Sequence, residues 1–78
     1  MKELVQFLAE HLVNNPSAVE VKETQGETAS VLELRVAKED LGRIIGKQGR
    51  TAKSIRTILN AVASRTNRKV VLEIIEEK

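Results

Sequence analysis

The stretch Ile44-Ile45-Gly46-Lys47-Gln48-Gly49-Arg50 separates two segments of helical pattern, and the rest of the chain can be organised around it. The pattern begins at about Glu39, breaks at residues 46–49 and resumes from Arg50 to Arg65. One face of the second segment carries the apolar residues Ala52, Ile55, Leu59, Val62 and Ala63. Two glycines at this spacing let a ligand approach the backbone closely, and both tolerate positive φ. The same pair is also compatible with a plain turn between two helices.

The residues that precede this stretch predict one helix and two strands. Apolar residues recur at helical spacing from Leu4 to Val13. This helix should end at Asn14-Asn15-Pro16, because proline disfavours helical geometry in the residue before it. Two runs rich in β-branched residues, Val19 to Thr24 and Thr28 to Val36, flank Gln25-Gly26-Glu27, which indicates a hairpin.

The residues that follow the helices predict a final strand. Residues Lys69 to Glu76 are so rich in Val, Leu and Ile that neither face of the strand should lie fully in water. A strand, two helices and a second strand form a crossover long enough to return parallel to the same sheet. We therefore expect an α+β fold in the order helix, strand, strand, helix, helix, strand. The helices should cover one face of a three-stranded mixed sheet, with residues 1–78 forming one domain.

Charge is distributed unevenly along the chain. Eight basic residues and no acidic residue lie between Leu41 and Leu72, whereas the rest of the chain holds five basic and all eleven acidic residues. The basic segment favours a polyanionic partner, although a solvated basic helix would give the same count. Phe7 is the only aromatic residue, which argues against nucleic-acid folds that stack bases on exposed rings.

The start of the helix at Arg50 breaks a local rule. Its first turn offers no acidic residue or serine to the free backbone N–H groups, unless Thr51 caps it late, and it carries Arg50 and Lys53. Cations at the positive end of the helix dipole disfavour the helix. Open amides beside cations suit an anionic group, so we interpret the stretch as a phosphate-binding site.

The same residues resemble a known family signature. The apolar pair Ile44-Ile45, the G-x-x-G of residues 46–49 and the anchor Ile55 resemble a KH domain. The flanking Asp40-Leu41-Gly42-Arg43 and Thr51-Ala52-Lys53-Ser54-Ile55-Arg56 are similar to the small bacterial single-KH proteins of the KhpA family. The helix-first order matches the type II KH topology, and the resemblance covers nearly all 78 residues. Ala52 departs from the pattern, since many KH domains carry a larger aliphatic residue there.

The resemblance implies an RNA-binding protein that acts as a post-transcriptional regulator or RNA chaperone. Its groove would hold about four unpaired nucleotides, with their backbone against the loop and their bases over an aliphatic floor. The residues implied are Gly46, Lys47, Gln48 and Gly49 of the loop, with Arg43, Arg50 and Lys53 as neighbouring phosphate partners. Ile44 and Ile45 are candidates for the floor, although such residues are more often buried in the core. Single-stranded DNA is compatible with the same groove.

A protein-interaction module is the main alternative. Ile58 lies beside Val62 at the edge of an apolar arc wider than one helix needs to cover a small sheet. The resemblance implies a homodimer, or a heterodimer with a larger KH protein of the Jag type, and this helix is the candidate interface.

Other classes are disfavoured. His11 has no cysteine or second histidine with which to form a catalytic or metal site, and Glu39 and Asp40 lie where acids favour a helix dipole. We therefore expect no enzymatic activity, no cofactor and no metal. The lack of cysteine, of a signal peptide and of a long apolar run predicts a cytoplasmic protein that does not cross a membrane.

Overall fold

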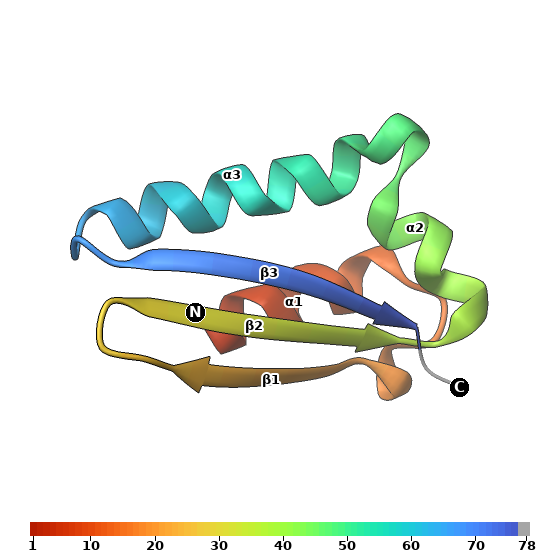
Figure 1. The fold of residues 1–78 in the computed structure, drawn as a ribbon. Coiled ribbons are helices and arrows are strands. Elements are labelled where there is room, and N and C mark those ends of the chain that lie inside the picture. The colour runs from red at the N-terminus through yellow and green to blue at the C-terminus, as the bar shows by residue number, and fades with distance from the viewer. Residues whose placement is uncertain (77–78) are drawn as a thin grey trace.

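The structure, a computed structural model, describes residues 1–76, and its elements follow the predicted order (Figure 1). The helices and strands are α1 (Lys2–Leu12), β1 (Glu20–Gln25), β2 (Ala29–Val36), α2 (Leu41–Ile45), α3 (Arg50–Ser64) and β3 (Lys69–Glu76). Short 3-10 turns lie at Pro16–Ala18, Lys38–Asp40 and Lys47–Gly49. β1 and β2 each begin one residue later than predicted, at Glu20 and Ala29, and α3 ends one residue earlier, at Ser64.

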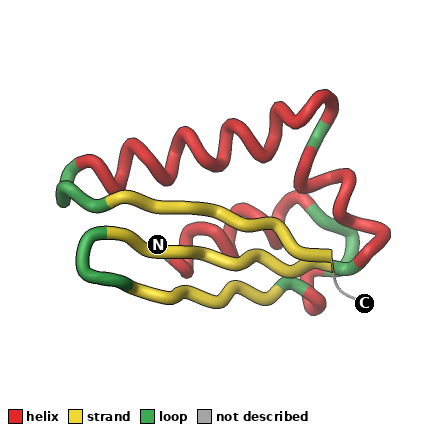
Figure 2. Tube along the Cα trace, viewed as in Figure 1, coloured by secondary structure: helices red, strands yellow, loops and turns green. Residues whose placement is uncertain are grey.

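The strands form one three-stranded sheet in the order β1-β2-β3. β1 runs antiparallel to β2, with Val21 opposite Leu34, whereas β3 runs parallel to β2, with Leu32 opposite Leu72. Figure 2 shows the three strands side by side, with α3 on the β3 side of the molecule. The mixed sheet and the α+β order are therefore confirmed. β1 and β3 are the edge strands in the described part of the chain.

The core lies between the sheet and the helices. Alternate residues of β2 point toward the helices, because successive side chains of a strand point to opposite faces, and Leu32, Leu34 and Val36 are fully buried. Each helix contributes side chains to the same cluster, namely Val5, Ala9, Ile44, Ile55, Leu59 and Ala63. Burying one Leu or Ile side chain contributes about 1.5–3 kcal/mol, so this single cluster supplies most of the driving force for folding.

The other face of the sheet is only partly covered. Val71 is 41% exposed, whereas Val31 and Ile75 on the same face are half-buried, so this face does not lie fully in water. Val31 of β2 lies directly beside Val71 in the parallel register. Neighbouring side chains on one sheet face shield part of each other's apolar surface, so the half-buried Val31 reduces the apolar area that Val71 exposes.

Candidate nucleic-acid interface

The loop between α2 and α3 has an unusual backbone. Gly46 (φ 76°) and Gly49 (φ 76°) both adopt positive φ, as their residue type predicted. Gln48 also adopts positive φ (58°), which the spacing of the glycines did not predict. A Cβ added at Gly46 would lie 2.6 Å from the Thr51 Cβ and 2.8 Å from the Thr51 backbone N. A Cβ at Gly49 would meet open space, so the two glycines are required for different reasons.

The start of α3 is left open to a ligand. Within residues 1–76, no side chain caps this helix, and its first turn carries no acidic residue. Thr51 therefore does not act as a late cap, and it packs instead against Gly46. The Gly49 N–H donates to the Gly46 carbonyl oxygen at 3.1 Å and the Arg50 N–H donates to the Lys47 carbonyl oxygen, which closes the loop into a tight turn. An anion at this helix start would therefore be attracted by the helix dipole and by the N–H groups that follow Arg50.

Four cations surround this helix start. Arg43, Lys47, Arg50 and Lys53 are all exposed. Arg50 Nη2 donates to Gln48 Oε1 at 3.4 Å, so the Arg50 side chain lies over the loop. Arg43 Nε lies 3.8 Å from Asp40 Oδ1, and the Arg43 side chain remains 55% exposed. Lys47, Arg50 and Lys53 thus lie in the loop and the first turn of α3, whereas Arg43 lies on α2 beside Asp40.

A groove of about 480 Å³ adjoins the loop and is lined by Leu41, Ile45, Gly49, Ala52, Arg56 and Ile74. Its walls come from α2, α3 and β3. Ile45 is 39% exposed, whereas the adjacent Ile44 is fully buried. Of these two candidates for the floor, Ile45 lines the groove and Ile44 packs in the core, because neighbouring helical residues point about 100° apart. The small side chain of Ala52 leaves room above the floor of the groove.

Asp40 holds α2 in place beneath the groove. Its side chain is almost fully buried, and its two oxygens accept the backbone N–H groups of Asn14 (3.1 Å) and Asn15 (3.0 Å). These bonds fasten the segment after α1 to the start of α2. Sequence reasoning missed this role, since it interpreted Asp40 as an acid that only favours a helix dipole.

One cation of the basic segment belongs to the scaffold. Arg68 donates to the carbonyl oxygens of Gly26 (3.0 Å) and Glu27 (3.4 Å) and to Ser30 Oγ (3.1 Å). It thereby ties the turn between β1 and β2 to the segment before β3. The count of basic residues consequently overstates the charge available to a polyanion.

The predicted dimer residues lie away from the loop. Ile58 and Val62 are each 42% exposed and lie one turn apart on α3. Arg56 and Asn60, which face β3, are on the opposite flank of the helix. The structure thus separates the charged site from the exposed apolar pair.

Metal-binding groups and membrane-spanning helices were both sought among the described residues. Between residues 1 and 76, no group of three or more His, Cys, Asp or Glu side chains could hold a metal ion. Across the same residues, no helix has the length and apolar character needed to cross a membrane.

Comparison with known proteins places the chain in a family. The family model described as "KhpA/KhpB, KH domain" matches residues 2–74. "RNA-binding protein KhpA" of Clostridium perfringens is 55% identical over 75 residues, which cover 96% of this chain and 100% of the relative. The protein of the same name from Chlamydia pneumoniae is 54% identical over 78 residues, 100% of both chains.

A more distant relative agrees with this assignment. "RNA-binding protein KhpA" of Borreliella burgdorferi is 46% identical over 74 residues, which cover 95% of this chain and 90% of the relative. No solved structure matches the chain. The order of elements and the mixed three-stranded sheet are consistent with a type II KH fold. On the family match and the relatives together, the chain belongs to the KhpA/KhpB family of KH domains.

Proposed function

We propose that this chain binds single-stranded RNA, with residues 46–49 holding the phosphate backbone and the adjoining groove receiving the bases. One observation carries the proposal: the glycine loop and the start of α3, which no described side chain caps and which carries the exposed cations Lys47, Arg50 and Lys53, adjoin a groove that Gly49 helps to line. A phosphate bonds favourably to open amides at a helix start, and the cations add a second attraction. The relatives named above are described as RNA-binding proteins, which supports the same conclusion.

Each residue of the site has a distinct proposed role. Lys47, at the tip of the loop, contacts a phosphate directly, and Arg43, Arg50 and Lys53 contact its neighbours. Ile45 belongs to the aliphatic floor against which the bases lie. A floor of this kind needs no aromatic residue, because KH-type grooves hold bases by apolar contact and hydrogen bonds as well as by stacking.

The small size of the groove suggests weak binding to many RNAs, which bears on the proposed role of the protein in the cell. One groove in a single KH domain of residues 1–78 contacts few nucleotides, so binding is weak and selects short motifs. Weak contact with many transcripts suits a post-transcriptional regulator or RNA chaperone in the cytoplasm. It does not require catalysis.

A charge-reversal variant tests the loop. The double variant Lys47→Asp, Gln48→Asp should lose at least about tenfold in affinity for a short single-stranded RNA, because it places two anions where the phosphate lies. Fluorescence anisotropy across a salt series measures the affinity, and wild-type binding should weaken as salt rises. The circular dichroism spectrum should stay unchanged, since both residues are exposed.

A matched control uses the same residue types elsewhere. Lys22→Asp, Gln25→Asp changes an exposed lysine and glutamine on β1, far from the loop in the chain, and should retain near wild-type affinity. Equal affinity of the loop variant and the wild type would contradict the assignment. A single-stranded DNA of the same sequence shows whether the 2′-OH contributes.

We propose dimer formation as a second function. Ile58 and Val62 expose apolar surface on a helix flank that RNA in the groove does not need. A second copy of the chain, or a larger KH protein of the Jag type, would cover this surface. RNA binding and pairing are therefore compatible in one molecule.

A further inference from the structure

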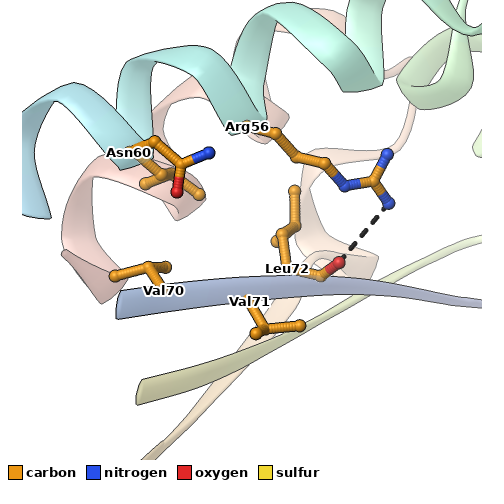
Figure 3. Close-up of a pocket in the computed structure, with 6 residues that line it drawn as sticks. Arg56, Asn60, Val70, Val71 and Leu72 are labelled. Atoms are coloured by element: carbon orange, nitrogen blue, oxygen red, sulfur yellow. Dashed lines mark hydrogen bonds between the residues drawn. The ribbon is translucent and has the colours of Figure 1, made fainter. Parts of the chain in front are cut away.

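Three arginines lie beside the glycine loop or the groove, and each has a different partner. Arg50 donates to a glutamine of the loop. Arg56 donates to the Leu72 carbonyl oxygen at 3.4 Å, and in Figure 3 its side chain extends from α3 toward β3. It lines the groove and also a second, smaller pocket of about 170 Å³ along β3. Within residues 1–76, only Arg43 of the three is paired with a carboxylate, which is that of Asp40.

Asp40 occupies the position from which an aspartate commonly caps its own helix. It immediately precedes α2, yet it makes no capping hydrogen bond with this helix. Its two side-chain oxygens instead accept the backbone N–H groups of Asn14 and Asn15, which lie 26 and 25 residues earlier in the chain. The residue best suited to stabilise the start of α2 is therefore used elsewhere, and local rules of this kind tend to be broken at functional sites.

These two hydrogen bonds make the Asp40 carboxylate a fixed charge. The side chain is buried, so dissolved ions screen it less than a surface carboxylate, and the two donors keep it from rotating. Arg43 Nε lies 3.8 Å from this carboxylate. An exposed arginine samples many rotamers, and ordering its side chain when a ligand binds costs free energy. A fixed anion beside it restricts these rotamers before the ligand arrives.

Arg43 lies next to the glycine loop along α2. It precedes Gly46 by three positions, so both residues are on one side of the helix. A guanidinium is planar, and it binds a phosphate best through two parallel N–H groups. With Nε beside Asp40, the two terminal nitrogens remain available for the phosphate. The orientation of the Arg43 guanidinium thus decides how well it contacts RNA held at the loop.

We propose that Asp40 is a positioning residue for RNA binding, because it holds the Arg43 guanidinium in the orientation that contacts a phosphate. The inference rests on the proposed RNA-binding function and names a residue that affects RNA without touching it. The Asp40 anion also repels phosphate, but this repulsion is the smaller effect. A phosphate cannot closely approach a buried carboxylate, and charge repulsion falls with distance. Asp40 therefore strengthens binding, although its charge has the same sign as that of RNA.

The sign of one substitution effect tests the inference. Asp40→Asn retains the shape of the side chain and removes its charge, so it should weaken binding of a short single-stranded RNA about fivefold. If Asp40 acted only by neutralising Arg43, the same substitution would strengthen binding. Glu39→Gln is the matched control, since it removes the charge of the preceding, exposed carboxylate. This control should leave the RNA affinity unchanged or slightly raised.

A double-mutant cycle shows whether Asp40 acts through Arg43. Arg43→Gln should weaken binding about fivefold and reduce the dependence of log affinity on log salt by about 0.7, the contribution of one phosphate contact. Asp40→Asn should reduce this dependence equally, and it should cause no further loss of affinity in the Arg43→Gln protein. A loss that came only from a disturbed fold would leave the salt dependence unchanged and would appear in both backgrounds. Circular dichroism determines the folded fraction of each variant.

The wild-type protein offers a readout that requires no substitution, and this readout decides the question if Asp40→Asn does not fold. The heteronuclear NOE of an arginine Nε–H group reports how restricted the side chain is on the picosecond-to-nanosecond timescale. Arg43 should give a higher value than Arg65, an exposed arginine with no ion pair within residues 1–76. Equal values for the two arginines would overturn the positioning role.

The outcomes are distinct. Unchanged or stronger binding by Asp40→Asn overturns the positioning role but leaves the phosphate site intact, and so does an equal loss in both backgrounds of the cycle. Absence of wild-type binding to RNA overturns the proposed function, and the inference with it.

Discussion

At the scale of single residues, Gly46 and Gly49 should respond differently to alanine. Gly49 (φ 76°, ψ 10°) has a left-handed helical conformation, which costs a residue with a Cβ about 1 kcal/mol, whereas Gly46 (φ 76°, ψ 173°) lies in a region that essentially only glycine occupies and that costs such a residue about 1–3 kcal/mol. Only at Gly46 would the Cβ also overlap the backbone of Thr51, which adds about 1–3 kcal/mol of overpacking. Gly46→Ala should therefore lower the free energy of unfolding by about 3 kcal/mol, and Gly49→Ala by about 1 kcal/mol. Urea denaturation measures both, and equal losses would contradict the geometry.

The same scale shows why part of the site was predictable. The positive φ of the two glycines follows from their residue type, since only glycine adopts it without strain. Gln48 has no such signature, and its positive φ follows from the turn closed by the Gly49 N–H. Ile44 and Ile45 are identical neighbours with opposite burial, because the phase of α2 against the sheet decides which one faces the core. The rotation of α2 about its own axis is set by its packing against the sheet, which the local sequence does not specify.

At the scale of elements, a change at the start of α3 should have opposite effects on the stability of the fold and on the proposed RNA affinity. Arg50→Glu replaces a cation at the first helical position with an anion that favours the helix dipole. The free energy of unfolding should rise by about 0.5 kcal/mol at low salt. RNA affinity should fall at least about tenfold, since the anion now repels the phosphate. Thermal unfolding and anisotropy on one protein preparation measure the two changes.

The other end of the helix supplies the control. Arg65, which follows the last residue of α3, is exposed and far along the helix from the loop. Arg65→Glu makes the same change at the negative end of the dipole, so it should lower stability by about 0.5 kcal/mol. It should leave RNA affinity nearly unchanged. A stability gain in both variants would point to net charge instead of the dipole as the cause.

Elements were predicted to within a residue or so because hydrophobic periodicity is local. Contacts between elements were harder to predict from the sequence. The bonds from Asp40 to the Asn14 and Asn15 amides join residues 26 and 25 positions apart, a separation that no spacing rule covers. The exposure of Val71 depends on which face of the sheet the helices cover, and the apolar run in β3 alone could not indicate this.

At the scale of the whole molecule, Ile58→Asp tests whether two copies pair through α3. Wild type should sediment as a dimer and the variant as a monomer, because an aspartate would lose its water in the interface. Val71→Asp is the matched control: Val71 is 41% exposed on the partly covered sheet face, against 42% for Ile58, and this variant should stay dimeric. Dissociation of both variants, or of neither, would contradict an interface at Ile58.

The parallel pairing of β3 with β2 also determines when the groove exists. Ala29 pairs with Lys69, so strands far apart in the sequence must meet before the sheet is whole. A nascent chain that has exposed only residues 1–68 already carries the glycine loop. It still lacks Leu72 and Ile74, which come from β3 and line the two pockets. The proposed capture of RNA through this groove would thus start only after residues 69–76 have left the ribosome.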